Sequence, residues 1–247
     1  MSASSEAFKP IPVRKGTGAL ADFLFSARLV ADLQLLTCVR YLKPRLAAVR
    51  GRVLDVGCGD MPFRSMLPAD TAYVGIDVAL AEDFGMAKHP DIQNFDGRSI
   101  PFANESFDCV LCTEVLEHAQ DPEFLLAEMR RVLRKGGLFI ATVPFAARVH
   151  HAPHDYHRFT CFRLEEMLSD FDTVIIEERG DDLAVIANKL IVVAARLAKK
   201  GLTWRLPLFL LALLVAMPAL ALAHASLAFG WGSKADPLGY GLSARKV

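Results

Sequence analysis

The sequence lacks three features that would place it outside the cell or on a nucleic acid. It has no excess of charge, because 28 Lys and Arg residues balance 28 Asp and Glu residues, so a generic DNA or RNA partner is not expected. Its five cysteines are an odd number without the spacing of a disulfide framework, which favours a reducing compartment. Residues 1–17 contain no apolar run typical of a secretory signal, and we expect a flexible tail there.

Apolar residues, in contrast, are abundant. They make up 53% of the 247 residues, which predicts a large core, a membrane contact, or both. The balanced total also conceals an asymmetry, because residues 183–235 contain basic side chains and no acidic one, so the remainder of the chain is net acidic. An acidic globular part with a basic, apolar appendage suggests a domain held at an anionic membrane surface.

Strand-like and helical patterns alternate along the first two thirds of the chain. Apolar positions between 19 and 49 recur at three- and four-residue spacing and predict one or two helices, interrupted at Pro44. A further helix is predicted from Pro122 to Leu133, with Gly136 and Gly137 as its C-terminal cap. Strands are predicted at 52–56, 73–78, 91–96, 107–113 and 138–145. This order predicts an α/β fold with a Rossmann-like, doubly wound parallel sheet.

A glycine turn follows the first predicted strand. Gly57 and Gly59 in VLDVGCGD can adopt positive φ angles and leave room for a ligand at the backbone, which is typical of nucleotide-cofactor sites. A dinucleotide site would have a third glycine where Pro62 stands, so NAD is disfavoured.

Acidic residues end the next two strands. Asp77 can accept hydrogen bonds from both hydroxyls of a ribose, although an N-cap role for the following helix is the alternative. Asp96 could meet an adenine amino group, or it could simply form a turn with Gly97.

Four ordered segments carry a family resemblance: VLDVGCGD, GIDV, DGRSIPFANESFDCVLCTEVLEH and LRKGGLFIATVP. In this order they resemble the class I S-adenosylmethionine-dependent methyltransferases, in particular the bacterial type 11 subgroup. The resemblance implies S-adenosylmethionine as cofactor. It also implies a final strand at 238–246, paired antiparallel with the one predicted at 171–178. The cofactor-binding residues that it implies are Asp55, Gly57, Cys58, Gly59, Asp77, Val78, Asp96, Gly97, Thr113 and Glu114.

Four histidines cluster in RVHHAPHDYHRFT, directly after a strand, where open α/β sheets bind ligands. Acceptor binding is the favoured interpretation, with His154 and Asp155 as the candidate catalytic pair. The alternative is a structural loop in which Asp155 pairs with Arg158 and the ring nitrogens bond to the backbone. A metal site is the least favoured, because the spacing matches no standard helix-borne site; no metal is therefore predicted.

Residues 206–229 contain no charged side chain and are long enough to cross a hydrocarbon core. A single crossing would prevent 236–247 from returning to the sheet as its final strand. We therefore expect residues 183–235 to be a helical insertion, a hairpin or re-entrant wedge that turns at Lys199-Lys200-Gly201 and bends at Pro218. A soluble helical pair, serving as a dimer interface or a lid, is the alternative. The core with its N-terminal helical cap is expected at 18–182.

The sequence thus predicts methyl transfer to a small-molecule or lipid-linked acceptor at the cytoplasmic face of a bacterial membrane, with oxygen as the preferred atom. No catalytic triad is needed, because methyl transfer from a sulfonium mainly requires alignment and exclusion of water. A non-catalytic cofactor-binding scaffold and an RNA or protein methyltransferase are the rival hypotheses. The acceptor and the oligomeric state are not predicted.

Overall fold

The computed structural model describes residues 11–13, 18–78, 89–199 and 205–247. One compact unit comprises residues 41–177 and 240–247 together with the described residues near the N-terminus, and the other comprises 18–40 and 178–239. The predicted domain limits of 18–182, 183–235 and 236–247 stay predictions.

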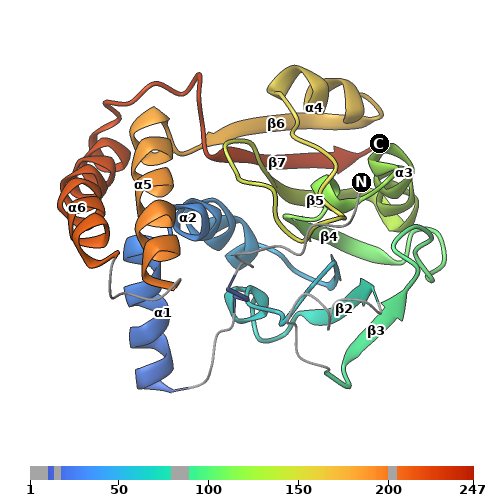
Figure 1. Cartoon of the computed structure of the whole chain (residues 1–247). Coiled ribbons are helices and arrows are strands. Elements are labelled where there is room, and N and C mark those ends of the chain that lie inside the picture. Colours follow the sequence, from blue (N-terminus) through green and yellow to red (C-terminus); the bar gives the residue numbers. More distant parts are fainter. Residues whose placement is uncertain (1–10, 14–17, 79–88, 200–204) are drawn as a thin grey trace. The chain divides into compact units, whose positions relative to one another are not determined.

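The first unit is built on a seven-stranded sheet with strand order β3-β2-β1-β4-β5-β7-β6 (Figure 1). Its strands are β1 (Arg52–Val56), β2 (Ala72–Val78), β3 (Ile92–Phe95), β4 (Phe107–Thr113), β5 (Leu133–Pro144), β6 (Phe171–Arg179) and β7 (Gly239–Lys246). Strands β1 to β5 pair in parallel. The Leu238 N–H, at the start of β7, bonds to the Arg179 carbonyl at the end of β6, as antiparallel neighbours do. The predicted Rossmann-like fold is confirmed.

The helices follow the predicted pattern with two corrections. They are α1 (Ala19–Ala31), α2 (Leu33–Ala47), α3 (Pro122–Val132), α4 (Cys161–Met167), α5 (Asp182–Lys199) and α6 (Leu206–Phe229), with short 3-10 turns η1 (Arg64–Met66) and η3 (Leu116–His118). The prediction of a break at Pro44 is wrong, because α2 continues through it; the break lies at Asp32, whose Oδ1 accepts the Leu35 N–H. The prediction that Gly136 and Gly137 cap α3 is also wrong, because both lie in β5.

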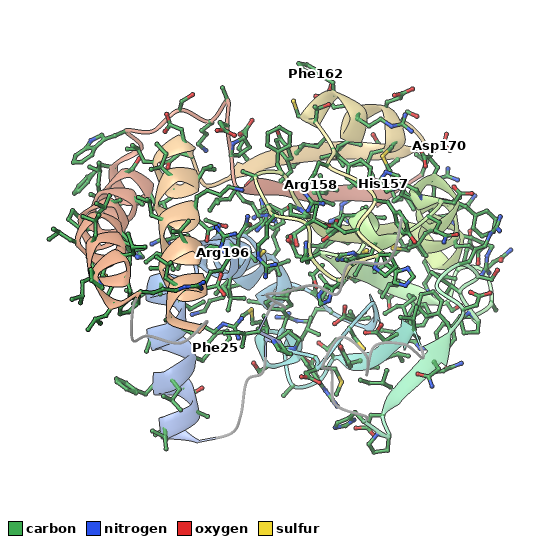
Figure 2. The ribbon with its side chains drawn as sticks, viewed as in Figure 1. Phe25, His157, Arg158, Phe162, Asp170 and Arg196 are labelled. Atoms are coloured by element: carbon green, nitrogen blue, oxygen red, sulfur yellow. The ribbon has the colours of Figure 1, made fainter. Side chains whose placement is uncertain are left out.

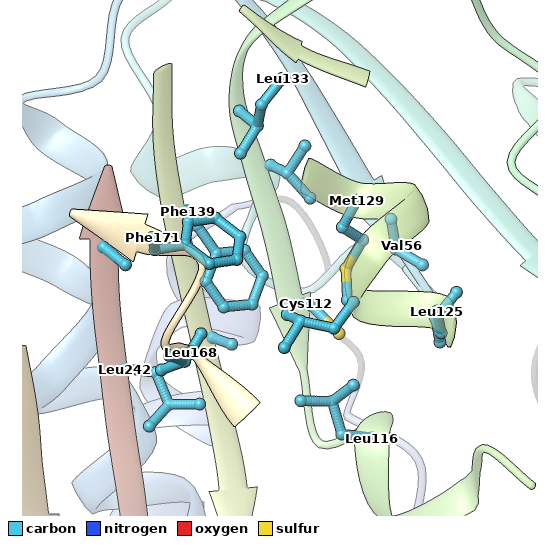
Figure 3. Close-up of a cluster of buried hydrophobic side chains, with 14 of the residues drawn as sticks. Val56, Cys112, Leu116, Leu125, Met129, Leu133, Phe139, Leu168, Phe171 and Leu242 are labelled. Atoms are coloured by element: carbon cyan, nitrogen blue, oxygen red, sulfur yellow. The ribbon is translucent and has the colours of Figure 1, made fainter. Parts of the chain in front are cut away.

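The core of the first unit lies between the sheet and the helices that cover it. Phe139 of β5 and Phe171 of β6 pack with their ring centroids 5.4 Å apart, and Met129 and Leu125 of α3 join the same buried cluster (Figure 3). Cys109 and Cys112 of β4 belong to the sheet interior as well, because both side chains are buried. Burial raises the pKa of Cys109 to about 12, which makes it an inert packing residue.

The second unit holds the predicted insertion as two helices side by side, α5 and α6 (Figure 1). Small buried side chains, including Ala184 and Ala187 of α5 and Ala216 and Ala223 of α6, allow close packing. Helix α6 runs unbroken through Pro218. Of the predicted turn Lys199-Lys200-Gly201, Lys199 is the last residue of α5, and Lys200 and Gly201 lie outside the described residues.

Candidate cofactor site

The glycine turn after β1 has the tight geometry that the sequence predicts. Gly57 and Gly59 have φ angles of 68° and 51°, in the left-handed region. The N–H groups of Gly57 and Cys58 both bond to the Ile76 carbonyl of β2, at 2.8 and 3.1 Å. A Cβ atom on Gly57 would lie 2.4 Å from the Val115 side chain, so this position admits no larger residue without movement. The turn is therefore fixed against β2 and against the segment after β4.

Asp77 connects this turn to the end of β2. Its Oδ2 accepts the Gly59 N–H at 2.7 Å and its Oδ1 accepts the Val78 N–H at 2.7 Å. Burial raises the pKa of Asp77, and these two hydrogen bonds partly offset the increase. A carboxylate has about four acceptor positions, so two remain available for a vicinal diol. The N-cap alternative concerns residues 79–88, which the structure does not describe.

Asp55 lies on the face of the sheet that Asp77 also uses, because its register partner in β2 is Gly75. The Tyr73 hydroxyl donates to Asp55 Oδ2 at 2.7 Å, whereas Oδ1 is buried without a hydrogen-bond partner among the described residues. Burial raises the pKa of Asp55 to about 7, although the Tyr73 bond opposes the shift. The Cys58 side chain fills the space beside Gly75, and burial raises the pKa of its thiol too.

The turn after β3 meets the end of β2. A Cβ atom on Gly97, whose φ is 76°, would lie 3.0 Å from Val78 Cγ1, so these two predicted residues are neighbours. Asp96 is exposed, and its Oδ1 accepts the N–H groups of Arg98 and Ser99, at 2.8 and 2.6 Å. These bonds account for a lowered pKa of Asp96. The geometry is that of the turn alternative, and an adenine contact stays a prediction.

Strand β4 ends at the same edge of the sheet. Thr113 pairs in register with Thr142 of β5, and the next residue, Glu114, has a φ of 54° and donates its N–H to the Thr142 carbonyl at 2.9 Å. The chain then enters η3, in which Glu117 is fully buried. Burial and the charge of Glu114 raise the pKa of Glu117 well above its ordinary value. The carboxyl ends of the parallel strands therefore bring all the predicted cofactor-binding residues to one edge.

The histidine loop runs from β5 to α4, and Figure 2 labels two of its residues, His157 and Arg158. Both carboxylate oxygens of Asp155 bond to the Arg158 guanidinium, at 2.6 and 2.8 Å, and Oδ2 also accepts the His150 N–H at 2.9 Å. Desolvation alone would raise the pKa of Asp155, but these bonds outweigh it and the net shift is downward.

Asp155 therefore serves as an anchor of the loop, as the structural alternative predicted. His154 lies nearer the surface, where its Nδ1 is 3.0 Å from the Tyr156 hydroxyl. The catalytic roles of His154 and Asp155 stay predictions.

Two features of the sheet and its edge define the class of protein. A seven-stranded sheet whose last strand inserts between β5 and β6, with a glycine turn bound to an acid at the end of β2, is the arrangement expected of class I methyltransferases. Residues 54–141 match a family described as methyltransferase domain, the type 11 group. The chain therefore contains a class I, S-adenosylmethionine-dependent methyltransferase domain of the type 11 family.

Relatives with assigned names match the same part of the chain. A ubiquinone biosynthesis O-methyltransferase of Sinorhizobium fredii is 35% identical over 101 residues, which are 37% of this chain and 41% of that protein. A phosphatidylethanolamine N-methyltransferase of Cereibacter sphaeroides is 30% identical over 105 residues, 39% of this chain and 52% of that protein. The chain thus matches about half of the length of these relatives or less.

Solved structures extend the likeness of the fold. A SAM-dependent methyltransferase from Archaeoglobus fulgidus superposes with a TM-score of 0.51 at 16% identity, covering 91% of this chain and 99% of that one. The cyclase SpnF gives a TM-score of 0.54 at 21% identity, covering 86% and 81%. At such identities the likeness concerns the fold.

The sequence did not indicate some residues of the candidate site, because only the register of the strands and the folding of the loops bring them to it. Tyr73 was one, and its signal was the alternation of Tyr73, Gly75 and Asp77 along β2, which places all three on the face of Asp55. Val115, packed against the glycine turn, was another. No local pattern in the sequence indicated that η3 would meet the histidine loop.

Proposed function

We propose that this chain transfers a methyl group from S-adenosylmethionine to an oxygen of a small-molecule or lipid-linked acceptor, at the cytoplasmic face of a bacterial membrane. The observation that carries the proposal is the hydrogen bond from the Gly59 N–H to Asp77 Oδ2, which links the glycine turn to the carboxylate at the end of β2. The family match of residues 54–141 supports the same cofactor.

The chemistry requires few reacting side chains. The acceptor oxygen forms a bond to the methyl carbon as the bond from that carbon to the sulfonium sulfur breaks, which yields S-adenosylhomocysteine. The hydroxyl proton leaves to a base or to water. The protein contributes by holding donor and acceptor in line at the edge formed by the glycine turn and Thr113.

The membrane part of the proposal is supported by the surface of the second unit. Helix α6 is apolar on all sides, and by length and composition it is the one described helix able to cross a membrane. Leu208, Leu211 and Leu214 are more than half exposed. Such side chains gain free energy when lipid replaces water around them.

Charge and a second helix also support membrane binding by the second unit. The exposed apolar side chains of α1 include Leu20 and Phe23, which are 71% and 68% exposed. Lys189 and Arg196 of α5 are exposed in the segment that lacks acidic residues, and they would favour anionic lipid. The names of the two relatives refer to a quinone lipid pathway and to a phospholipid, which supports a lipid-linked acceptor for this chain too.

Catalysis is tested by incubating the protein with methyl-labelled S-adenosylmethionine and fractionated bacterial extract. We expect label in the lipid or small-molecule fraction, together with S-adenosylhomocysteine. Cofactor binding without product in any fraction would favour a non-catalytic scaffold. Label in RNA or protein would favour an RNA or protein methyltransferase.

Membrane binding is tested by flotation with vesicles that contain phosphatidylglycerol. We expect the wild type to float and the double variant Leu211→Glu/Leu214→Glu to remain in the dense fraction with its cofactor affinity unchanged. The matched control is Phe162→Glu, because Phe162 is also exposed, at 76%, but projects from α4 in the first unit (Figure 2). Flotation of all three proteins, or of none, would contradict the membrane part of the proposal.

A further inference from the structure

The strongest feature that the cofactor site leaves unexplained is a cluster of three histidines beside a buried acid. One ring nitrogen from each of His118, His150 and His151 lies within 4.8 Å of the others. His118 comes from η3 and the other two from the loop after β5. The ring centroids of His118 and His150 are 4.8 Å apart, and that of His151 lies 5.3 and 5.2 Å from them.

The hydrogen bonds of two of these rings fix which nitrogen carries the proton. His118 Nδ1 lies 2.6 Å from the His154 carbonyl oxygen, and His150 Nδ1 lies 3.1 Å from the Arg148 carbonyl oxygen and 3.2 Å from Asp155 Oδ2. These oxygens accept hydrogen bonds, so each Nδ1 must donate. In the neutral form of each ring, Nε2 then carries the lone pair.

Both lone pairs face the same carboxyl group. Glu117 Oε1 lies 3.6 Å from His118 Nε2 and 3.9 Å from His150 Nε2. The Glu117 side chain is fully buried, and neither of its oxygens has a hydrogen-bond partner among the described residues. A buried carboxyl group without a partner is costly, and a cation between the three groups would remove that cost.

We propose that Glu117, His118, His150 and His151 form a binding site for a divalent transition-metal ion of the Zn²⁺ class. Imidazole nitrogens with one carboxylate oxygen suit this class, whereas Mg²⁺ and Ca²⁺ prefer oxygen ligands. Ligands bound at about 2.1 Å lie roughly 3.4 Å apart in a tetrahedral site. The ring nitrogens lie within 4.8 Å of one another, so side-chain movements of about 1 Å would complete the arrangement. The Glu117 oxygen is already near that separation from two rings.

The surroundings of the cluster are those of a metal centre. Asp155 Oδ2 accepts the His150 backbone N–H at 2.9 Å and lies 3.2 Å from His150 Nδ1, and Arg158 holds the same carboxylate, so Asp155 helps to orient a metal-binding imidazole. This gives Asp155 a role as a positioning residue. The proposed metal site differs from the sequence-based expectation of no metal. The spacing within the loop could not indicate the site, because the third histidine, His118, comes from η3, far away in sequence.

The position of the cluster suggests what the ion does, and this step rests on the proposed function. His118 follows Glu114 at the end of β4, where we expect donor and acceptor to meet. An ion there would bind the acceptor oxygen and favour loss of its proton before the methyl group is transferred.

The site is tested by titrating the purified full chain, treated first with a chelator, with Zn²⁺ and Co²⁺ by calorimetry and absorption spectroscopy. We expect one ion per chain and Co²⁺ bands typical of nitrogen and oxygen ligands, without a thiolate charge-transfer band. Mg²⁺ should give no comparable signal. Substitutions His151→Ala and Glu117→Gln each remove a ligand, so each should weaken binding by at least the roughly 10- to 100-fold that loss of an outer-shell partner costs.

The matched control is His89→Ala, which removes a histidine outside the cluster and should bind the ions as the wild type does. Thermal unfolding without metal identifies variants that fail to fold, and the more exposed His151 keeps the test usable if Glu117→Gln unfolds. Absence of binding by the wild type, or equal binding by His151→Ala, would overturn the metal site. Because these readouts need no acceptor, methyl transfer could fail while the metal site stands, and the reverse.

Discussion

The Asp77 carboxylate offers the most direct test of the cofactor site. Two of its acceptor positions are occupied by the Gly59 and Val78 N–H groups, which leaves two for the ribose hydroxyls of the cofactor. In Asp77→Asn the amide NH₂ replaces one acceptor oxygen and removes the charge. A hydrogen bond to a charged group contributes about 1.5–3 kcal/mol, so the loss of ribose contacts costs about 3 kcal/mol, or roughly 150-fold in Kd.

Calorimetric titration with S-adenosylhomocysteine measures this change. The control Asp70→Asn removes an exposed carboxylate in the connection before β2 and should leave the Kd unchanged. Urea unfolding without ligand separates weak binding from a damaged fold. If folded Asp77→Asn binds within about threefold of the wild type, well under 1 kcal/mol, the assignment of this edge to the cofactor is refuted.

Three further changes test the glycine turn, the buried Asp55 carboxyl group and the helical unit. Gly57→Ala should cost about 3 kcal/mol of stability because its Cβ has no room, whereas Gly136→Ala, with similar φ but open space, should cost about 1 kcal/mol; urea unfolding measures both. The pKa of Asp55 is raised from 3.8 to about 7, so its contribution to stability is complete below about pH 4 and is lost as the pH rises through 7. Asp55→Asn should remove that fall, of up to about 4 kcal/mol, and an unchanged pH profile would contradict the shift. Ser226→Ala should cost about 2 kcal/mol in chemical unfolding, because its buried hydroxyl donates to Asp181 at 2.6 Å; no change would show that this bond does not stabilise the helical unit.

The central strands were predictable because their signal is local. Strands β1 and β4 match their predicted limits, since each is a short apolar run bounded by turn residues and buried on both faces of a parallel sheet. The start of β5 was not predictable in this way. Both Leu133 and Leu138 pair with β4, and Gly136 and Gly137 fit into the irregularity between them.

Pro44 was a misleading guide. It stands in the last turn of α2, where few intrahelical bonds depend on it, so the helix around the residue outweighs its intrinsic preference. Pro218 stands inside α6, and the bend expected there stays a prediction.

In the candidate site, too, the residues with a local sequence signal were predictable and those brought together by the fold were not. The glycine turn and Asp77 were predictable because strand, turn and strand tip follow one another with fixed spacing. The contact between Asp55 and Tyr73 depends on the register of two strands, and the meeting of His118 with His150 depends on how η3 and a loop fold against each other. His154 and Asp155, the residues that the sequence favoured in this loop, stay predictions.

The bond between the Leu238 N–H and the Arg179 carbonyl has a practical consequence, because both helices of the insertion lie in the chain between these two residues. The excursion leaves and rejoins the sheet at neighbouring backbone positions, so a short Asn-Gly reverse turn could replace it and still bring β7 into place. Such a shortened protein would separate what the cofactor-binding sheet does alone from what its apolar attachment adds.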